Sequence, residues 1–166
     1  KRWARMLAPA YPVELCARWT GGNGHDTSAA MLALHARRSA ESILAWKTQH
    51  PERPLVLALT GTDLYRDIHV DPVAQRSLQL ADQLIVLNRL GLEQLPPSLR
   101  QKAQVVLQSC SGRATLPKSQ RRLRVLMVGH LRAEKDPQTY FDAVRLLAAE
   151  PHIHCDHIGA ALDPAL

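Results

Sequence analysis

Short apolar runs alternate with stretches of helical periodicity along most of the chain. Consecutive apolar positions predict buried strands, and apolar residues recurring at i, i+3 and i+4 predict amphipathic helices. The apolar runs cover residues 31–34, 54–59, 84–87, 105–107, 123–128 and 153–158. The helical stretches cover residues 39–49, 72–81, 90–95 and 137–149. This alternation predicts parallel sheets with right-handed crossovers, so we expect an α/β fold.

The beginning of the chain follows this pattern less regularly. Residues 1–7 are typical of the end of a helix, stopped by Pro9, and residues 11–19 alternate as a strand would. The glycines of 21–24 lack the spacing of a dinucleotide fingerprint and predict a loop. Because the chain starts at Lys1 and stops soon after a second new strand, we expect a fragment cut at both ends.

A change of composition predicts two domains. Residues 110–122 are rich in Ser, Gly, Pro, Lys and Arg without an apolar period, which is typical of a linker. We therefore expect a first domain over residues 1–109, lacking its first strand, and the start of a second domain over residues 123–166. Strand ends of the two domains would face a shared cleft.

The charge is positive and unevenly distributed. Lys and Arg number 21 against 15 Asp and Glu, and the whole excess lies before residue 119. This suits an anionic small molecule as well as a nucleic acid. With aromatic residues at only 4% and no basic stripe among them, nucleic acid is the weaker alternative.

Composition also narrows the class of protein. No apolar run approaches the roughly 20 residues that a bilayer requires, and no signal peptide is present, so we expect no membrane partner. An odd number of widely spaced cysteines argues against a disulfide framework and fits a reducing cytoplasm. They are Cys16, Cys110 and Cys155.

Polar and charged residues gather where predicted strands end, which is the edge that binds ligands in open α/β sheets. His35, Arg37 and Arg38 follow the first run, and residues 60–67 follow the second. The run at 123–128 leads into Gly129 and a charged turn, and Asp136-Pro137 then supplies a helix cap. Cations beside a helix N-terminus favour an anion, so the turn is a candidate phosphate site. The alternative is a solvated loop that binds nothing.

Several segments, taken in order, resemble one family. They are ALHARRSAESI, PLVLALTGTDLYRDI, SLQLADQLIVLN, LRQKAQVVLQS and VGHLRAEKDP. The family is that of the selenosugar synthases of selenoneine biosynthesis, a branch of the retaining GT-B glycosyltransferases. The resemblance implies a GT-B fold of two Rossmann-like parallel-sheet domains. It also implies transfer of N-acetylglucosamine from UDP-N-acetylglucosamine to selenophosphate, with loss of phosphate. No cofactor or metal is expected, and the fragment itself would be inactive.

The resemblance also implies roles for single residues. In the first domain we expect His35, Asp63 and Arg66 to be catalytic, while others bind the acceptor. The acceptor-binding residues would be Arg37, Arg38, Gly61, Thr62 and Tyr65. Asp63 would be the only acid in this cluster. It either orients a sugar hydroxyl or a cationic partner, or caps a helix or turn.

In the second domain, the residues after the first strand would bind the nucleotide sugar. They are Gly129, His130, Arg132, Glu134 and Lys135. Lys135 stands where related enzymes have a pyrophosphate-binding Lys, whereas His130 replaces the usual Arg. Preorganised cations would stabilise the departing diphosphate without a metal.

Other interpretations remain open. The acceptor of a GT-B enzyme could differ, or the protein could be a non-catalytic nucleotide-binding module. Basic residues at 121–124 could bind RNA. A zinc site is a further alternative, but on one strand its candidate ligands would point to opposite faces. These are His152, His154, Cys155, Asp156 and His157.

Overall fold

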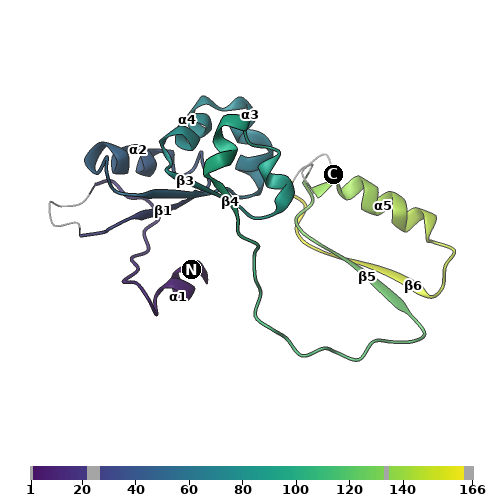
Figure 1. Cartoon of the computed structure of the whole chain (residues 1–166). Helices are drawn as coiled ribbons and strands as arrows, with labels where there is room; N and C mark the ends of the chain where they lie inside the picture. Colours follow the sequence, from purple (N-terminus) through teal and green to yellow (C-terminus); the bar gives the residue numbers. More distant parts are fainter. Residues whose placement is uncertain (1, 22–26, 133–134, 163–166) are drawn as a thin grey trace. The chain divides into compact units, whose positions relative to one another are not determined.

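The computed structural model describes residues 2–21, 27–132 and 135–162. The chain divides into two compact units, which we call unit 1 (Lys1–Cys110) and unit 2 (Ser111–Leu166) (Figure 1). Each unit contains one parallel sheet, so the α/β class that the alternation predicts is confirmed. Both sheets are compatible with Rossmann-like domains.

Unit 1 is built on a four-stranded parallel sheet in the order β1-β2-β3-β4. Consecutive strands are neighbours, and right-handed crossovers in one direction place their helices on one face. α2 and α4 lie together on that face (Figure 1). The strands are β1 (Met31–Leu34), β2 (Leu55–Ala58), β3 (Gln83–Val86) and β4 (Ala103–Val105). The helices are α1 (Arg2–Leu7), α2 (Ala40–Gln49), α3 (Ile68–Val70) and α4 (Pro72–Leu80).

Three short segments of other helix types join these elements. A π-helical segment, η1 (Asp63–Asp67), follows β2 and runs directly into α3. The other two are the 3₁₀ helices η2 (Arg89–Leu92) and η3 (Pro97–Lys102). η2 replaces the helix predicted over 90–95, and β4 begins at Ala103, two residues before the predicted strand. A π segment after a strand is notable because such insertions occur frequently at functional sites.

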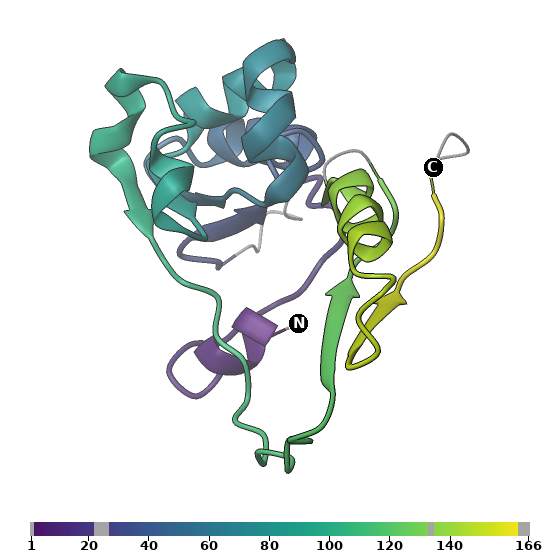
Figure 2. The same cartoon turned by 90° about the vertical axis from the view of Figure 1, so that its right-hand side faces the viewer.

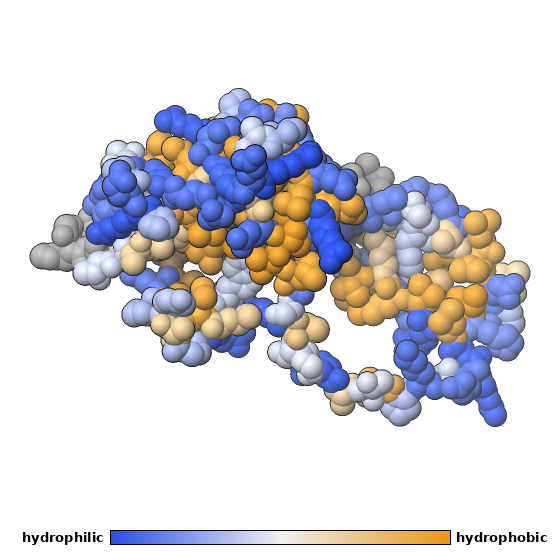
Figure 3. Space-filling view, viewed as in Figure 1, coloured by the Kyte–Doolittle hydropathy of each residue, from blue (hydrophilic) through white to orange (hydrophobic). Residues whose placement is uncertain are grey.

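The core of unit 1 lies between the sheet and the helices on its covered face. Trp46 of α2 is almost fully buried there. The largest buried side chains around it are Ile43, Leu55, Leu57, Leu59, Leu64, Leu78 and Leu84. Because strand side chains alternate between faces, Leu32 and Leu34 of β1 remain exposed. Hydrophobic surface is accordingly visible on unit 1 in Figure 3.

The strand predicted over residues 11–19 is wrong, because residues 12–20 form no strand in the structure. The segment is held instead at its end, where Trp19 N donates to Ser42 Oγ at 2.9 Å and the Trp19 ring meets Trp46 edge-on. An alternating pattern becomes a strand only when a neighbouring backbone pairs with it. Gly21 is in a loop with φ of 110°, and residues 22–24 lie outside the described residues.

Unit 2 contains a parallel pair, β5 (Leu123–Val128) and β6 (Ile153–Ile158), joined through α5 (Pro137–Leu146). α5 begins at Pro137 as predicted and contacts the pair through the Tyr140 hydroxyl, which donates to Asp156 O at 2.8 Å. Figure 2 shows α5 beside β5.

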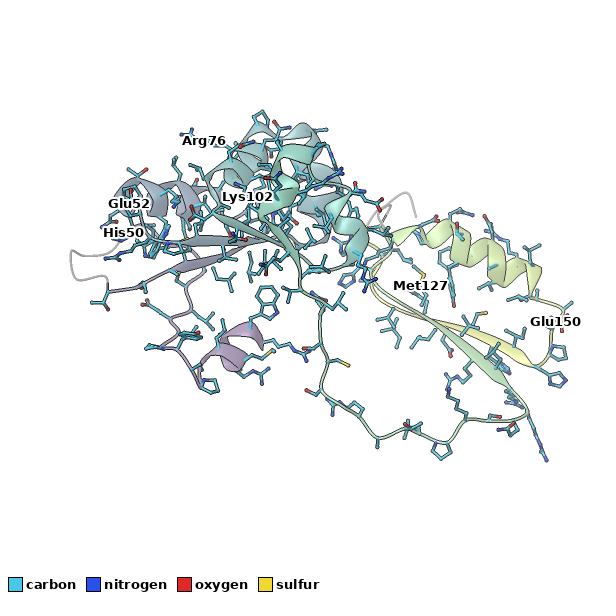
Figure 4. The ribbon with its side chains drawn as sticks, in the orientation of Figure 1. His50, Glu52, Arg76, Lys102, Met127 and Glu150 are labelled. Atoms are coloured by element: carbon cyan, nitrogen blue, oxygen red, sulfur yellow. The ribbon has the colours of Figure 1, made fainter. Side chains whose placement is uncertain are left out.

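β5 differs from the prediction in its burial. Consecutive apolar residues predicted a strand covered on both faces, yet only Met127 (labelled in Figure 4) is half-buried, while Leu126 and Val128 are exposed. Among the described residues of unit 2, β5 has one neighbouring strand and one helix against its faces, which is too little to bury it.

Candidate functional site

The loops that follow β1, β2 and β3 meet at one end of the unit 1 sheet. Main-chain bonds join the strand ends, because His35 N donates to Ala58 O at 3.0 Å and Leu59 N donates to Ile85 O at 2.8 Å. His35 itself has a left-handed backbone, with φ of 74°. A non-glycine residue in that region carries local strain, which occurs preferentially at functional positions.

Asp63 is fully buried and links two of these loops. Its Oδ2 accepts from Ala36 N at 2.8 Å, and its Oδ1 accepts from Thr60 N and Thr60 Oγ1, both at 2.8 Å. These contacts are those of a cap that joins the loop after β1 to the loop after β2. Of the two roles left open by the sequence, capping is the one that its contacts support.

Asp67 is a second buried acid at this end of the sheet, so the expectation that Asp63 is the only acid there is wrong. Arg37 Nε donates to Asp67 Oδ2 and Arg66 Nε donates to Asp67 Oδ1, each at 3.0 Å. Arg37 Nε also lies 3.8 Å from Asp71 Oδ2. Arg37, expected to bind the acceptor, and Arg66, expected to be catalytic, are thus already ion-paired.

The two arginines also set the protonation of Asp67. Burial by itself raises the pKa of the Asp67 carboxyl, but hydrogen bonds and charges from Arg66 and Arg37 outweigh burial. The net effect holds the pKa below its ordinary value of 3.8. Asp67 therefore remains a carboxylate at neutral pH and neutralises part of the local positive charge. Sequence reasoning could have found this residue, because it lies in the same charged run as Asp63.

His35 lies between these two carboxylates. Its side chain is 9% exposed, with Nδ1 3.9 Å from Asp63 Oδ2 and Nε2 3.9 Å from Asp67 Oδ2. Arg38 N lies 3.3 Å from Nδ1, and a backbone N–H can only donate, so Nδ1 accepts. The neutral ring consequently carries its proton on Nε2, a buried atom without a hydrogen-bond partner in the described part of the chain.

The remaining predicted residues of unit 1 lie on the same end of the sheet. A Cβ at Gly61 would meet nothing within 4 Å, so the space above this loop is open. Thr62 is half-buried, and the exposed Tyr65 receives a hydrogen bond at its hydroxyl from Asn88 Nδ2 at 2.9 Å. The Arg38 side chain is exposed and has no ion-pair partner within the described ranges.

In unit 2 the predicted nucleotide-sugar residues follow β5 closely. Gly129 N donates to Ile158 O at 2.9 Å, and the stem of Lys135 lies beside Gly129, with Cγ 3.7 Å from where a Cβ would be. His130, Arg132 and Lys135 are exposed. None of them has a carboxylate partner among the residues that the structure describes, and Glu134 lies outside those residues.

The N-terminus of α5 is already occupied by an acid. Asp136 is the N-cap, and its carboxylate accepts from Thr139 N at 3.4 Å and from Thr139 Oγ1 at 2.6 Å. An anion placed directly on this helix end would compete with that carboxylate. Any attraction for an anion at the tip of β5 would therefore come from the basic side chains and not from the helix.

The alternative sites on β6 and the linker have other contacts. No group of three or more His, Cys, Asp or Glu side chains is arranged to hold a metal within residues 2–21, 27–132 and 135–162. Arg124, one of the three arginines considered for RNA binding, pairs with Asp156, with Nη2 2.6 Å from Oδ2. An open hollow lies at the amino ends of β5 and β6, lined by residues that include Arg121, Arg122 and His152.

A further charged group lies at the amino ends of the unit 1 strands. Asp82 Oδ2 accepts from Leu55 N at 2.7 Å, and Lys47 Nζ lies 2.9 Å from the same oxygen. Lys102 (Figure 4) donates to two backbone carbonyls at the end of α4, at 3.2 and 2.5 Å. Burial lowers the pKa of Lys102, and Asp82 offsets part of that effect. These contacts hold α4 to the sheet and are therefore structural. The candidate site remains at the carboxyl ends of the strands.

No helix within the described ranges has both the length and the apolar character needed to cross a membrane. Comparison with known proteins leaves the family of the chain open. No protein-family model matches the sequence, and no significant match is found among curated proteins.

Proposed function

We propose that this protein is a glycosyltransferase that moves a sugar from a nucleotide-sugar donor to an anionic acceptor. The specific reaction proposed is transfer of N-acetylglucosamine from UDP-N-acetylglucosamine to selenophosphate, which yields a selenosugar with loss of phosphate. Two motifs on which the resemblance rests support the proposal, because LTGTDLYRD follows β2 and GHLRAEKDP follows β5. Ligands of open α/β sheets bind at such strand ends.

The observation that carries the proposal is the basic tip of β5. His130, Arg132 and Lys135 are exposed within a few residues of each other, without a carboxylate partner among the described side chains. When the bond from the anomeric carbon to the diphosphate breaks, negative charge builds on the departing oxygens. Cations already in place stabilise that charge without reorganisation at the moment of reaction.

In this proposal, unit 1 binds the acceptor at the tips of β1 and β2. Arg38 has an exposed side chain for the anion, whereas Arg37 and Arg66 contribute while held by Asp67. His35 and Asp63 are buried, so they support the loops from beneath. Gly61 and Tyr65 border the open space on this side.

The test is direct. The whole gene product is incubated with UDP-N-acetylglucosamine labelled in the sugar and with selenophosphate, and the products are separated and identified. Release of UDP with transfer of label to selenium supports the proposal. Absence of any transfer by the whole gene product contradicts it.

Lys135→Ala sharpens the same assay. Removing one charge-stabilising group typically reduces turnover about a hundredfold or more. Lys118→Ala, which removes an exposed lysine from the extended segment at the start of unit 2, is the matched control and should leave turnover unchanged. An unchanged rate for Lys135→Ala would remove this lysine from the site.

One observation favours a second candidate, a glycosyltransferase with an uncharged acceptor. The pairing of Arg37 and Arg66 with Asp67 reduces the positive charge available at the tips of unit 1. Replacing selenophosphate by thiophosphate, phosphate and uncharged hydroxyl acceptors in the labelled assay separates the two candidates. Transfer to an uncharged acceptor alone would support the second.

A further inference from the structure

The side chain of His130 is held by a backbone group of the neighbouring strand end. Ala160 N lies 3.0 Å from His130 Nδ1, across 30 residues of sequence. A backbone N–H can only donate, so Nδ1 accepts and carries no proton. The neutral ring then has its proton on Nε2, the nitrogen on the far side of the ring from Ala160.

Ala160 is itself held in place, because the loops after β5 and β6 are fastened to each other. Leu131 N donates to Ala160 O at 2.9 Å, and His157 Nε2 donates to Gly129 O at 2.8 Å. Gly159 passes so close to this loop that a Cβ there would collide with Gly129 O. The N–H of Ala160 is therefore a fixed donor, and it fixes the imidazole in turn.

The other nitrogen of His130 is available to a ligand. His130 is exposed, and its Nε2 has no hydrogen-bond partner among the described residues. Lys135, whose stem lies beside Gly129, brings a positive charge to the same loop. The acid of this turn that the structure describes, Asp136, is engaged with Thr139. A rigid N–H donor beside a cation fits the oxygen of an anion.

We propose that His130 binds the diphosphate of the donor as a neutral Nε2–H donor, and that Ala160 sets this tautomer. This inference rests on the proposed function for the identity of the ligand. It assigns His130 a role different from that of a cation: the ring supplies one directed hydrogen bond, while Lys135 and Arg132 supply charge. Ala160 acts as a positioning residue through its main chain.

Two substitutions separate the two ring nitrogens. In His130→Asn the amide oxygen takes the place of Nδ1 and can still accept from Ala160, but the distal donor is lost. In His130→Gln the amide nitrogen takes the place of Nε2, so the distal donor is kept. Affinity is measured by calorimetry with UDP and with inorganic pyrophosphate as probes, on the whole gene product.

We expect His130→Asn to weaken binding of both probes about tenfold or more, as is typical for loss of a hydrogen bond to a charged group. His130→Gln keeps the distal donor but not the bond to Ala160, so it should bind both probes more tightly than His130→Asn. Equal affinity of His130→Asn and wild type would overturn the proposal. So would absence of probe binding by the wild-type protein.

A second measurement needs no ligand. Nitrogen-15 spectra of the His130 ring should show an unprotonated Nδ1 and a protonated Nε2 at neutral pH, and the opposite tautomer would overturn the inference. The two proposals also fail separately. If the Asn and Gln variants differ as expected but no sugar is transferred, only the glycosyltransferase proposal fails. If sugar is transferred and His130→Asn binds UDP normally, only the role of His130 fails.

Discussion

The two units each have a histidine within two residues of the end of a parallel strand, and the two histidines differ in their surroundings. His35 and His130 both accept a backbone N–H at Nδ1, from Arg38 at 3.3 Å and from Ala160 at 3.0 Å. His35 is buried between the carboxylates of Asp63 and Asp67, whereas His130 is exposed in a basic turn. The same kind of backbone bond thus orients both rings, and burial and charge decide what each can do.

The charges around the two histidines also differ. In unit 1, Asp67 neutralises part of the charge of Arg37 and Arg66, which makes that strand end largely a supporting network. In unit 2, Arg132 and Lys135 have no carboxylate partner among the described residues. A ligand anion would therefore gain more at the tip of β5 than at the tips of β1 and β2.

The largest effect is expected from removal of the acid that supports unit 1. Asp63→Ala leaves the N–H groups of Ala36 and Thr60 without their acceptor inside the protein. Leaving a buried donor without an acceptor costs about 1–3 kcal/mol for each group, so we expect the free energy of unfolding of unit 1 to fall by several kcal/mol. Denaturant unfolding followed by tryptophan emission measures this, since Trp3, Trp19 and Trp46 all belong to unit 1. A loss below about 1 kcal/mol would show that the network is not a support.

The next largest effect is expected from replacing a glycine in unit 2, and a glycine in unit 1 supplies the control. In Gly159→Ala the new Cβ would collide with Gly129 O, so the loops after β5 and β6 must separate, at a typical cost of about 1–3 kcal/mol. Gly61→Ala is the matched control, because a Cβ there meets nothing within 4 Å. Amide hydrogen exchange should rise across β5 and β6 in the first variant, with no change in unit 1 for the second. Unchanged exchange in Gly159→Ala would show that the two loops are not fastened together.

The smallest effect is expected from acidification. Because Arg66 and Arg37 hold the folded pKa of Asp67 below 3.8, its contribution to stability is fully present above that value. The contribution is lost as the pH falls through the lower, folded pKa. Asp67→Asn cannot lose a charge there, so its stability should fall less than that of the wild type below about pH 4. Denaturant unfolding between pH 7 and pH 3 checks this, and parallel curves for the two proteins would contradict it.

Much of the fold could be predicted from the sequence because it depends on local signals. The apolar runs give β1, β2, β3, β5 and β6 within a residue or two, and proline at a helix start gives the beginnings of α4 and α5. Asp71 and Asp136 cap these two helices as their positions before proline predict. The prediction that His35, Asp63 and Tyr65 lie at one end of a sheet is confirmed, because parallel strands end at the same edge.

Only the tertiary structure decided the contacts that give those residues their environment. The link from Arg37 to Asp67 and that from His130 to Ala160 each span 30 residues, and no local pattern encodes such a pairing. The same reason explains why residues 12–20 form no strand and why β5 is exposed, since both depend on which neighbours pair with or cover them. Sequence determined where strands and helices form, through short-range periodicity and capping. Long-range packing determined which charges are neutralised and which histidine nitrogen accepts a backbone N–H.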